Sequence, residues 1–282
     1  MNILKQYWLD QFHSEQTEEG SIWERKKQLC KKRGYEIIRI RGSGEVFQTL
    51  RVDNQLYYSY ILHVSFLMKR DQHFYIEEQA VPYQFHLAEG MIAGHTALSL
   101  LTRQKAVPTL SLQAGDERGN DRFIYDRRAA VQYAERWWND YNPDYRAFPV
   151  DCTNYVSQCL KAGGAPMRGA PDRDKGWWYS NDNWSYSWSV AHSLRWYLSG
   201  STTGLKGKEI EDPQDLEPGD VICYDFSGDG RFDHNTIVVA KDVDGYPLVN
   251  AHTDNSRHRY WSYEDSLAWT PNCKYKFFRI GE

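Results

Sequence analysis

The stretch Asp151-Cys152-Thr153-Asn154-Tyr155-Val156 begins a short helical pattern that stops at Gly163-Gly164. Its apolar residues recur at the spacing i, i+3, i+4, i+7 and i+8, which is typical of the buried face of a helix. These residues are Cys152, Tyr155, Val156, Cys159 and Leu160. Because Cys152 is the first of them, the pattern places a thiol at the start of a helix, pointing into the protein. Unpaired backbone N–H groups and the positive end of the helix dipole favour the thiolate there.

A candidate base follows in the segment Asp233–Ala240, where His234 opens an apolar strand. Hydrolysis of an amide by a thiol needs a thiolate, a site for the oxyanion and a proton donor for the leaving amine. Cys152 with its own backbone N–H can supply the first two, and an imidazole can supply the third. A cysteine on a helix followed by a histidine on a later strand is the order of papain-like enzymes. We therefore expect Cys152 and His234 to form a nucleophile and base pair.

A third group should orient the imidazole, and the predicted hairpin narrows the choice. Val243-Asp244-Gly245 is expected to form a three-residue loop, with glycine at the position that needs a positive φ. In that register Asp254 lies opposite His234, His252 is its diagonal neighbour on the same face, and Asn250 is one step further. We expect the third group to be His252, with Asn250 as second choice and Asp254 as third.

Two polar residues flank the thiol in the sequence. Asp151 is expected to cap the helix by accepting from a backbone N–H. Its negative charge opposes thiolate formation, so we assign it a structural role. Asn154 is a candidate for a hydrogen bond to the oxyanion or to the substrate.

The segment after this helix is rich in aromatic residues and is expected to lie over a cleft. Four of its tryptophans are candidate substrate-binding residues: Trp177, Trp178, Trp184 and Trp188. Aromatic burial alone would also explain such a cluster. A packed wall is therefore the more frequent outcome, and a sugar-stacking platform is the alternative.

Composition and charge exclude several classes of function. The chain has 282 residues, a net charge of -4 and a pI near 6.2, so it offers no basic field for nucleic acid. Its start lacks the apolar core of a signal peptide, and no run approaches the roughly eighteen apolar residues of a membrane span. We expect a soluble protein, cytoplasmic as written, with export by another route left open. The five cysteines include no C-x-x-C pair, so we expect no disulfide framework, no metal site and no cofactor.

The first part of the chain has the pattern of helices followed by a sheet. Residues 3–33 have helical periodicity, either as two helices or as one broken at Gly20. From Tyr35 to about Phe85 the pattern alternates, as in an antiparallel meander. Its turns are expected at three places: Gly42-Ser43-Gly44, Asp53-Asn54 and Arg70-Asp71.

The polar stretch 113–121 is the expected linker between an N-terminal domain, residues 1–112, and a C-terminal domain, residues 122–282. In the C-terminal domain, helices at about 125–138 and 189–198 accompany the cysteine helix, and the strands come last. This order predicts an α+β fold in which the helix with the nucleophile packs on an antiparallel sheet with the base. The sequence predicts no role for the N-terminal domain and no oligomeric state.

The C-terminal domain contains short motifs in this order: Ala129–Ala134, Asp151–Gln158, Gly163-Gly164, Trp177–Tyr179, Leu216–Val221, Asp233-His234 and Ala251–Thr253. Together they resemble the putative amidase domain family, which is related to the NlpC-type and CHAP cell-wall peptidases and amidases. The resemblance covers about residues 122–280. It implies a papain-like fold, Cys152 as nucleophile, His234 as base, and an amide substrate, by analogy that of peptidoglycan. It does not extend to residues 1–112.

The sequence therefore predicts a cysteine-dependent hydrolase of amide bonds that acts on a peptide or peptidoglycan-like substrate. The alternative is a catalytically inactive amidase-like module that binds wall peptide or glycan, since a wall hydrolase without a signal peptide needs another route to the outside. A third interpretation is a zinc site of Cys152, His234 and His252. It lacks the closely spaced ligand pairs of the usual zinc sites.

Overall fold

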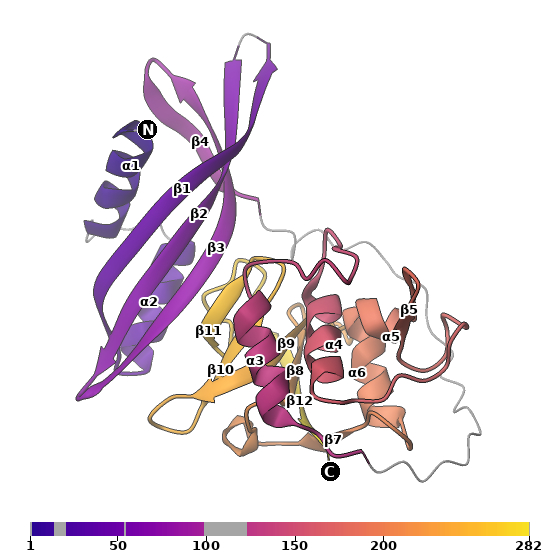
Figure 1. Cartoon of the computed structure of the whole chain (residues 1–282). Coiled ribbons are helices and arrows are strands. Elements are labelled where there is room, and N and C mark those ends of the chain that lie inside the picture. The colour runs from indigo at the N-terminus through magenta and orange to yellow at the C-terminus, as the bar shows by residue number, and fades with distance from the viewer. Residues whose placement is uncertain (1, 14–20, 54, 99–122, 282) are drawn as a thin grey trace. The chain divides into compact units, whose positions relative to one another are not determined.

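The computed structural model describes residues 2–13, 21–53, 55–98 and 123–281. The fold is α+β, with helices and antiparallel strands (Figure 1). Two compact units make up the chain: the first contains Met1–Thr102 and Tyr263–Trp269, and the second contains Arg103–Ser262 and Thr270–Glu282. The predicted linker, residues 113–121, lies outside the described residues.

The first unit consists of helices followed by long strands: α1 (Asn2–His13), α2 (Ile22–Lys32), β1 (Glu36–Val52), β2 (Gln55–Arg70), β3 (His73–Ala88) and β4 (Met91–Ala97). The strands pair in chain order and are antiparallel, so the predicted helices and meander are confirmed. On β2, every second residue from Tyr60 to Met68 is buried. This face packs with helix side chains that include Trp8 and Trp23, as expected for a sheet with one covered side.

One predicted turn is wrong. Gly42-Ser43-Gly44 lies inside β1, where Gly42 pairs with Val64 and Gly44 pairs with Leu62. A Cβ atom added to Gly44 would lie 3.2 Å from the Leu4 side chain and 3.3 Å from the Tyr60 ring. Glycine at this position therefore leaves room for side chains that cross the strand, and the chain continues without a reversal.

The second unit begins with helices and ends with strands: α3 (Arg127–Trp137), α4 (Cys152–Ala162), β5 (Tyr179–Ser180), β6 (Asn183–Trp184), α5 (Tyr186–Ser189), α6 (Ala191–Gly200), β7 (Gly207–Ile210), the 3₁₀ turn η2 (Pro213–Asp215), β8 (Val221–Asp225), β9 (His234–Lys241), β10 (Pro247–Ala251), β11 (Ser256–Tyr260) and β12 (Lys274–Ile280). The larger strands lie in the order β11-β10-β9-β8-β12-β7 and are antiparallel. No helix in the described part of the chain is long and apolar enough to cross a membrane.

Helices α3, α4 and α6 pack on one face of these strands (Figure 1). In α4 every residue from Cys152 to Leu160 is buried. Its apolar face meets Cys223 on β8 and Ile237 and Val239 on β9. Full burial of a leucine-sized side chain contributes about 1.5–3 kcal/mol. This packing holds the start of α4, and therefore Cys152, in a fixed place above the sheet.

The motif Leu216–Val221 has a structural role in leading the chain into β8. Gly219 has a φ of 94°, a left-handed conformation that side chains disfavour. Its carbonyl accepts from the Tyr125 hydroxyl at 2.8 Å. Asp220 is buried and forms an ion pair with Arg127 at 2.6 Å. These contacts connect the start of α3 to the start of β8.

The predicted hairpin loop between β9 and β10 is confirmed. The Asp242 backbone N–H donates to the Tyr246 carbonyl at 2.8 Å, which closes the loop Val243-Asp244-Gly245. Gly245 has a φ of 82°, as the three-residue loop requires.

The register beyond that loop differs from the prediction. A bulge shifts the pairing by one residue, so that Asn250 faces Ile237. Strand β10 ends at Ala251, and Asp254 has a left-handed φ of 60° in the following turn. The predicted pairing of Asp254 with His234 is therefore wrong, because one extra residue in a strand changes every later partner.

Candidate active site

Cys152 is the first residue of α4, and the turn after β10 covers this end of the helix. The Thr253 hydroxyl accepts hydrogen bonds from the backbone N–H groups of Asp151 at 2.9 Å and Cys152 at 3.2 Å. Asp151 makes no capping bond to the helix with its side chain, so the predicted cap is wrong. Its carboxylate accepts instead from the Phe148 backbone N–H and the Asn154 amide, both at 2.9 Å. Thr253 thus supplies the cap from a distant element.

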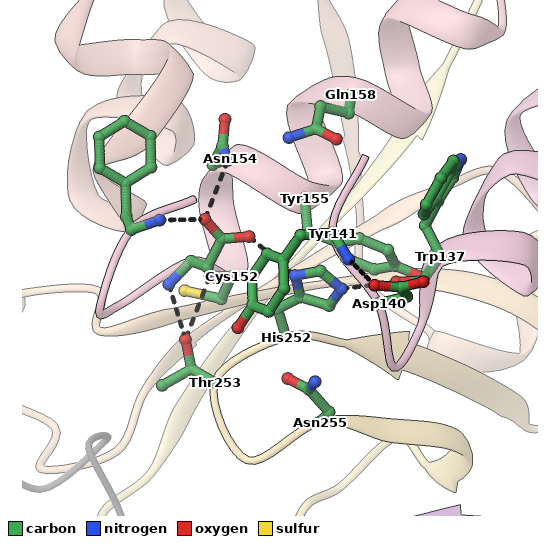
Figure 2. A network of polar contacts seen from close by, with 12 residues as sticks. Trp137, Asp140, Tyr141, Cys152, Asn154, Tyr155, Gln158, His252, Thr253 and Asn255 are labelled. Atoms are coloured by element: carbon green, nitrogen blue, oxygen red, sulfur yellow. Dashed lines mark hydrogen bonds and ion pairs between the residues drawn. The ribbon is translucent and has the colours of Figure 1, made fainter. Parts of the chain in front are cut away.

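The structure places His252 beside Asp151. The imidazole Nδ1 lies 2.7 Å from the Asp151 carboxylate, and Nε2 lies 2.7 Å from the Trp137 carbonyl oxygen. The ring stacks on Tyr155, one helical turn after Cys152, at a centroid distance of 4.1 Å. Figure 2 shows Cys152 and His252 in one network, with Thr253 next to Cys152.

Both nitrogens of His252 therefore face hydrogen-bond acceptors. A neutral imidazole can donate from only one nitrogen, whereas an imidazolium donates from both. His252 is 3% exposed and Asp151 is fully buried, so little water screens this pair.

The Cys152 thiol is 2% exposed, and its environment opposes ionisation. Burial raises the pKa of Cys152 above its ordinary value, and the Asp151 charge acts in the same direction. Hydrogen bonds from the Asn235 backbone N–H and from Thr153 lower the pKa, but they do not outweigh burial. The helix start favours the thiolate less than desolvation disfavours it.

The structure does not bring His234 to Cys152. The Asn235 side chain accepts from the Thr153 hydroxyl at 2.9 Å, so Asn235 faces α4. Adjacent residues of a strand point to opposite faces, and His234 therefore faces away from α4. There its ring lies 5.6 Å from that of Tyr224. Burial lowers the pKa of His234 to about 3, and the charge of Arg259 acts in the same direction.

The predicted alternatives for the third group have other contacts. Asn250 donates to the Glu135 carboxylate of α3 at 2.9 Å and accepts from the His258 backbone N–H at 2.9 Å. Burial would raise the pKa of Glu135, but hydrogen bonds from His258 and Arg257 lower it to about 2. Asp254 lies in the turn after β10. Asn250 therefore contacts α3 and β11.

Asn154 lies beside Asp151 and is hydrogen-bonded to it. Its amide donates to Asp151 and to the Arg146 carbonyl, both at 2.9 Å, while its oxygen accepts from the Trp188 indole at 2.8 Å. The side chain is fully buried. Its hydrogen bonds hold the Asp151 carboxylate in place.

Three of the four predicted substrate-binding tryptophans belong to the core. Trp177, Trp178 and Trp188 are at most 2% exposed. The Trp177 indole donates to the Ser157 hydroxyl of α4 at 2.9 Å, so this wall positions the helix. Trp184 differs from them, because it is partly exposed and lies on the short strand β6.

The predicted zinc alternative has no support in the geometry. It needed Cys152, His234 and His252 around one ion, and β9 directs His234 away from α4. Within the described ranges, no three His, Cys, Asp or Glu side chains are grouped as a metal site.

The sequence did not predict the contact between Asp151 and His252 or the role of Thr253 as a cap. These contacts join residues about one hundred positions apart, and hydrophobic periodicity carries no information on them. The one sequence feature that points to them is their position, since His252 and Thr253 follow directly after the apolar strand that ends at Ala251.

Comparison with known proteins identifies the class. Residues 124–278 match the family described as "Putative amidase domain", and the chain belongs to this family. The match covers the helices and the sheet of the second unit, including both sides of the Asp151 and His252 contact.

The chain is also similar to two proteins of Bacillus subtilis (strain 168). It is 46% identical over 274 residues to the uncharacterized protein YhbB, which covers 92% of this chain and 86% of that protein. It is 32% identical over 126 residues to the uncharacterized protein YjcM, which covers 42% of this chain and 28% of that protein. No solved structure matches. Since the first similarity covers 92% of the chain, it extends beyond the family match into the first unit.

Proposed function

We propose that this protein hydrolyses amide bonds in a papain-like reaction with Cys152 as nucleophile, His252 as base and Asp151 as the group that orients His252. The observation that carries the proposal is the 2.7 Å contact between His252 and Asp151, the residue directly before Cys152. Membership of the amidase family supports hydrolase chemistry. His234, which the sequence favoured as base, has no role in this reaction.

The chemistry follows from these groups. The Cys152 thiol gives its proton to the neutral imidazole of His252, and the resulting thiolate attacks the carbonyl carbon, so that an S–C bond forms and the oxygen becomes an oxyanion. As the C–N bond breaks, the His252 imidazolium gives its proton to the departing amine, and water then hydrolyses the thioester. General acid and base catalysis contributes about 100- to 10,000-fold, and the Asp151 carboxylate stabilises the imidazolium in the same way as in other triads.

The proposal requires the start of α4 to open when substrate binds. His252 Nε2 contacts the Trp137 carbonyl, and Thr253 occupies the Cys152 backbone N–H that would otherwise stabilise the oxyanion. A carbonyl oxygen of the substrate would replace the Thr253 hydroxyl at that N–H. An oxyanion donor of this kind contributes roughly 100- to 1,000-fold.

The proposed substrates are peptide amides of the type found in peptidoglycan. The resemblance of the motifs to wall amidases and peptidases supports this class. Both matched Bacillus subtilis proteins are uncharacterized, so their names give no support for a particular substrate.

A second candidate function is an amidase-like module that binds peptide without cleaving it. A specific observation favours it: the Cys152 thiol is buried with a raised pKa, and both nitrogens of His252 are occupied. In such a module these groups form a packed core below the binding surface.

Turnover of defined muropeptides by wild-type protein and two cysteine variants tests the proposal. Cys152→Ala should abolish release of the amine. Cys159→Ala is the matched control, because Cys159 is a buried cysteine on the same helix and has no role in the reaction. Equal turnover by wild type and Cys152→Ala would refute the proposal, and absence of turnover in every protein would favour the binding module.

A further inference from the structure

Two guanidinium groups lie over the partly exposed ring of Trp184. The Cζ atom of Arg173 is 4.9 Å from the ring centroid, and that of Arg146 is 5.5 Å from it. Phe148 meets Trp184 edge-on at 4.8 Å, and Tyr179 lies at 14° to it at 6.1 Å. These five residues are called the Trp184 patch below.

The Trp184 patch is attached to the start of α4. The Arg146 carbonyl accepts from the Asn154 amide at 2.9 Å, and the Phe148 backbone N–H donates to Asp151 at 2.9 Å. The Arg146 backbone N–H donates to the Tyr179 hydroxyl at 2.9 Å. Arg146 and Phe148 precede Cys152 by only a few residues, so the patch and the proposed nucleophile belong to one packed region.

A tight hairpin presents the aromatic part of the patch. Tyr179 and Trp184 are cross-strand partners on β5 and β6. The two residues between the strand ends, Asn181 and Asp182, have φ values of 49° and 57°, as in the two-residue turns that favour asparagine and aspartate. A cross-strand pair holds both rings on one face of the hairpin. The site is therefore formed before any ligand binds.

Contact with the ring leaves hydrogen-bond donors on each guanidinium. A guanidinium carries five N–H donors in a planar fork that matches a carboxylate. Arg173 also lies 5.2 Å from the Tyr186 ring, so two rings hold it. Arg146 pairs with Asp182 at 3.4 Å, but both side chains are more than half exposed and the pair is weak.

We propose that the Trp184 patch binds a carboxylate of an acidic peptide, next to the amide that Cys152 attacks. This inference rests on the proposed function for the position of the bond that is cleaved. Arg173 is the main contact and Arg146 the second. Because guanidinium groups lie over the Trp184 ring, an acidic peptide fits the patch better than a sugar ring, which needs an uncovered aromatic face.

The test uses two fluorescent hexapeptides that differ only in Glu against Gln at the third position. Binding is measured with the full-length Cys152→Ala protein, which does not consume the peptides. We expect the Glu peptide to bind about 5- to 10-fold more tightly than the Gln peptide, which is the difference between a charge-assisted and a neutral hydrogen bond. Arg173→Ala on this background should remove the preference, and Arg173→Lys should restore part of it.

Lys175→Ala is the matched control. It removes one positive charge from the same loop, but Lys175 pairs with Asp172 at 3.0 Å and lies outside the Trp184 patch. The preference for Glu should survive this change. Equal binding of both peptides by the folded Cys152→Ala protein, or a preference that survives removal of both arginines, would overturn the inference.

The same peptides separate this inference from the proposed function. Cleavage of both peptides by wild-type protein with equal kcat/KM would overturn the carboxylate subsite and leave the hydrolase standing. A Glu preference that depends on Arg173, together with no cleavage by wild-type protein, would support the subsite and count against the hydrolase.

Discussion

Two opposing effects act on the Cys152 thiol. Its position at the start of α4 favours the thiolate, whereas full burial and the Asp151 charge raise its pKa. Because the desolvation of a buried charge exceeds the effect of a helix end, the resting protein holds Cys152 as a thiol. Under the proposed function, activation of Cys152 then depends on substrate binding and on His252.

Alkylation of Cys152 tests this balance. A raised pKa means that the thiolate forms at higher pH, so the labelling rate in the folded protein should still be rising above pH 9, the ordinary value for a cysteine. The rate is followed by mass spectrometry of the peptide that contains Cys152, with urea-unfolded protein as the control. Complete and rapid labelling of folded protein at pH 7 would show that the helix end affects the pKa of Cys152 more than burial does.

The lowered pKa of His234 predicts that the stability of the protein depends on pH. Its pKa is lowered to about 3 in the folded protein by burial, against about 6.5 in an unfolded chain. Between these values the unfolded chain binds a proton that the folded protein does not. The free energy of unfolding therefore does not depend on His234 above about pH 6.5. As the pH falls towards 3, protonation of His234 in the unfolded chain lowers it by up to about 1.4 kcal/mol per pH unit.

The His234→Gln variant should lose this dependence. Its urea midpoint should change less between pH 7 and pH 5 than that of wild type, because glutamine does not titrate. Identical changes in the two proteins would mean that His234 is protonated in the folded state.

Cys152 could be predicted from the sequence, and the orientation of His234 could not. The apolar face of α4 has a clear helical period that begins at Cys152. In contrast, residues 237–240 are apolar without alternation, because both faces of β9 are buried. Alternation is the only signal of which strand residues face a helix, so nothing in the pattern distinguished His234 from Asn235.

At the scale of elements, the turn after β10 completes the start of α4. Thr253 accepts from the backbone N–H groups of Asp151 and Cys152, and its own φ of 63° is unusual for a β-branched residue. The contact compensates for this conformation, as at other sites where backbone strain is maintained by surrounding structure.

Replacement of Thr253 measures this cap. Thr253→Ala removes the acceptor of two buried N–H groups and should lower the free energy of unfolding by about 0.5–2 kcal/mol. Thr253→Ser keeps the hydroxyl and should stay close to wild type. Urea denaturation gives both values, and equal losses in the two variants would show that the methyl group matters more than the hydroxyl.

Some elements could be predicted because their signals are local. The loop Val243-Asp244-Gly245 needs a glycine at one position, and the chain has it. The bulge in β9 shifts its pairing with β10 at Val249, and the passage of Gly42-Ser43-Gly44 through β1 depends on side chains from other elements, such as Leu4 and Tyr60. Such contacts are absent from a local pattern, and the predicted register and turn failed there.

At the scale of the whole molecule, the segment Tyr263–Trp269 belongs to the first unit although it lies near the C-terminus. Lys26 of α2 forms ion pairs with Glu77 and, at 2.6 Å, with Asp265 of this segment. All three side chains are at most 2% exposed. The order of motifs predicted the amidase family, but no local pattern in the sequence predicted this long-range contact.

Two lysines that reach the same segment allow a matched comparison. Lys26→Met leaves two buried carboxylates without their counter-charge and should lower the free energy of unfolding of the first unit by about 3–5 kcal/mol. Lys32 pairs with Glu264 at 2.8 Å, but its side chain is 66% exposed, and Lys32→Met should cost less than about 1 kcal/mol. Urea denaturation measures both losses. Similar losses in the two variants would contradict the conclusion that the buried ion pairs of Lys26 matter more than the exposed ion pair of Lys32.

Turnover of one muropeptide by the His252→Gln and His234→Gln variants, each measured under conditions where it is folded, tests the central claim most directly. We expect His252→Gln to lower kcat by about 100- to 10,000-fold, the usual contribution of a catalytic base, and His234→Gln to retain kcat within a few-fold of wild type. Loss of turnover in His234→Gln with full turnover in His252→Gln would contradict it.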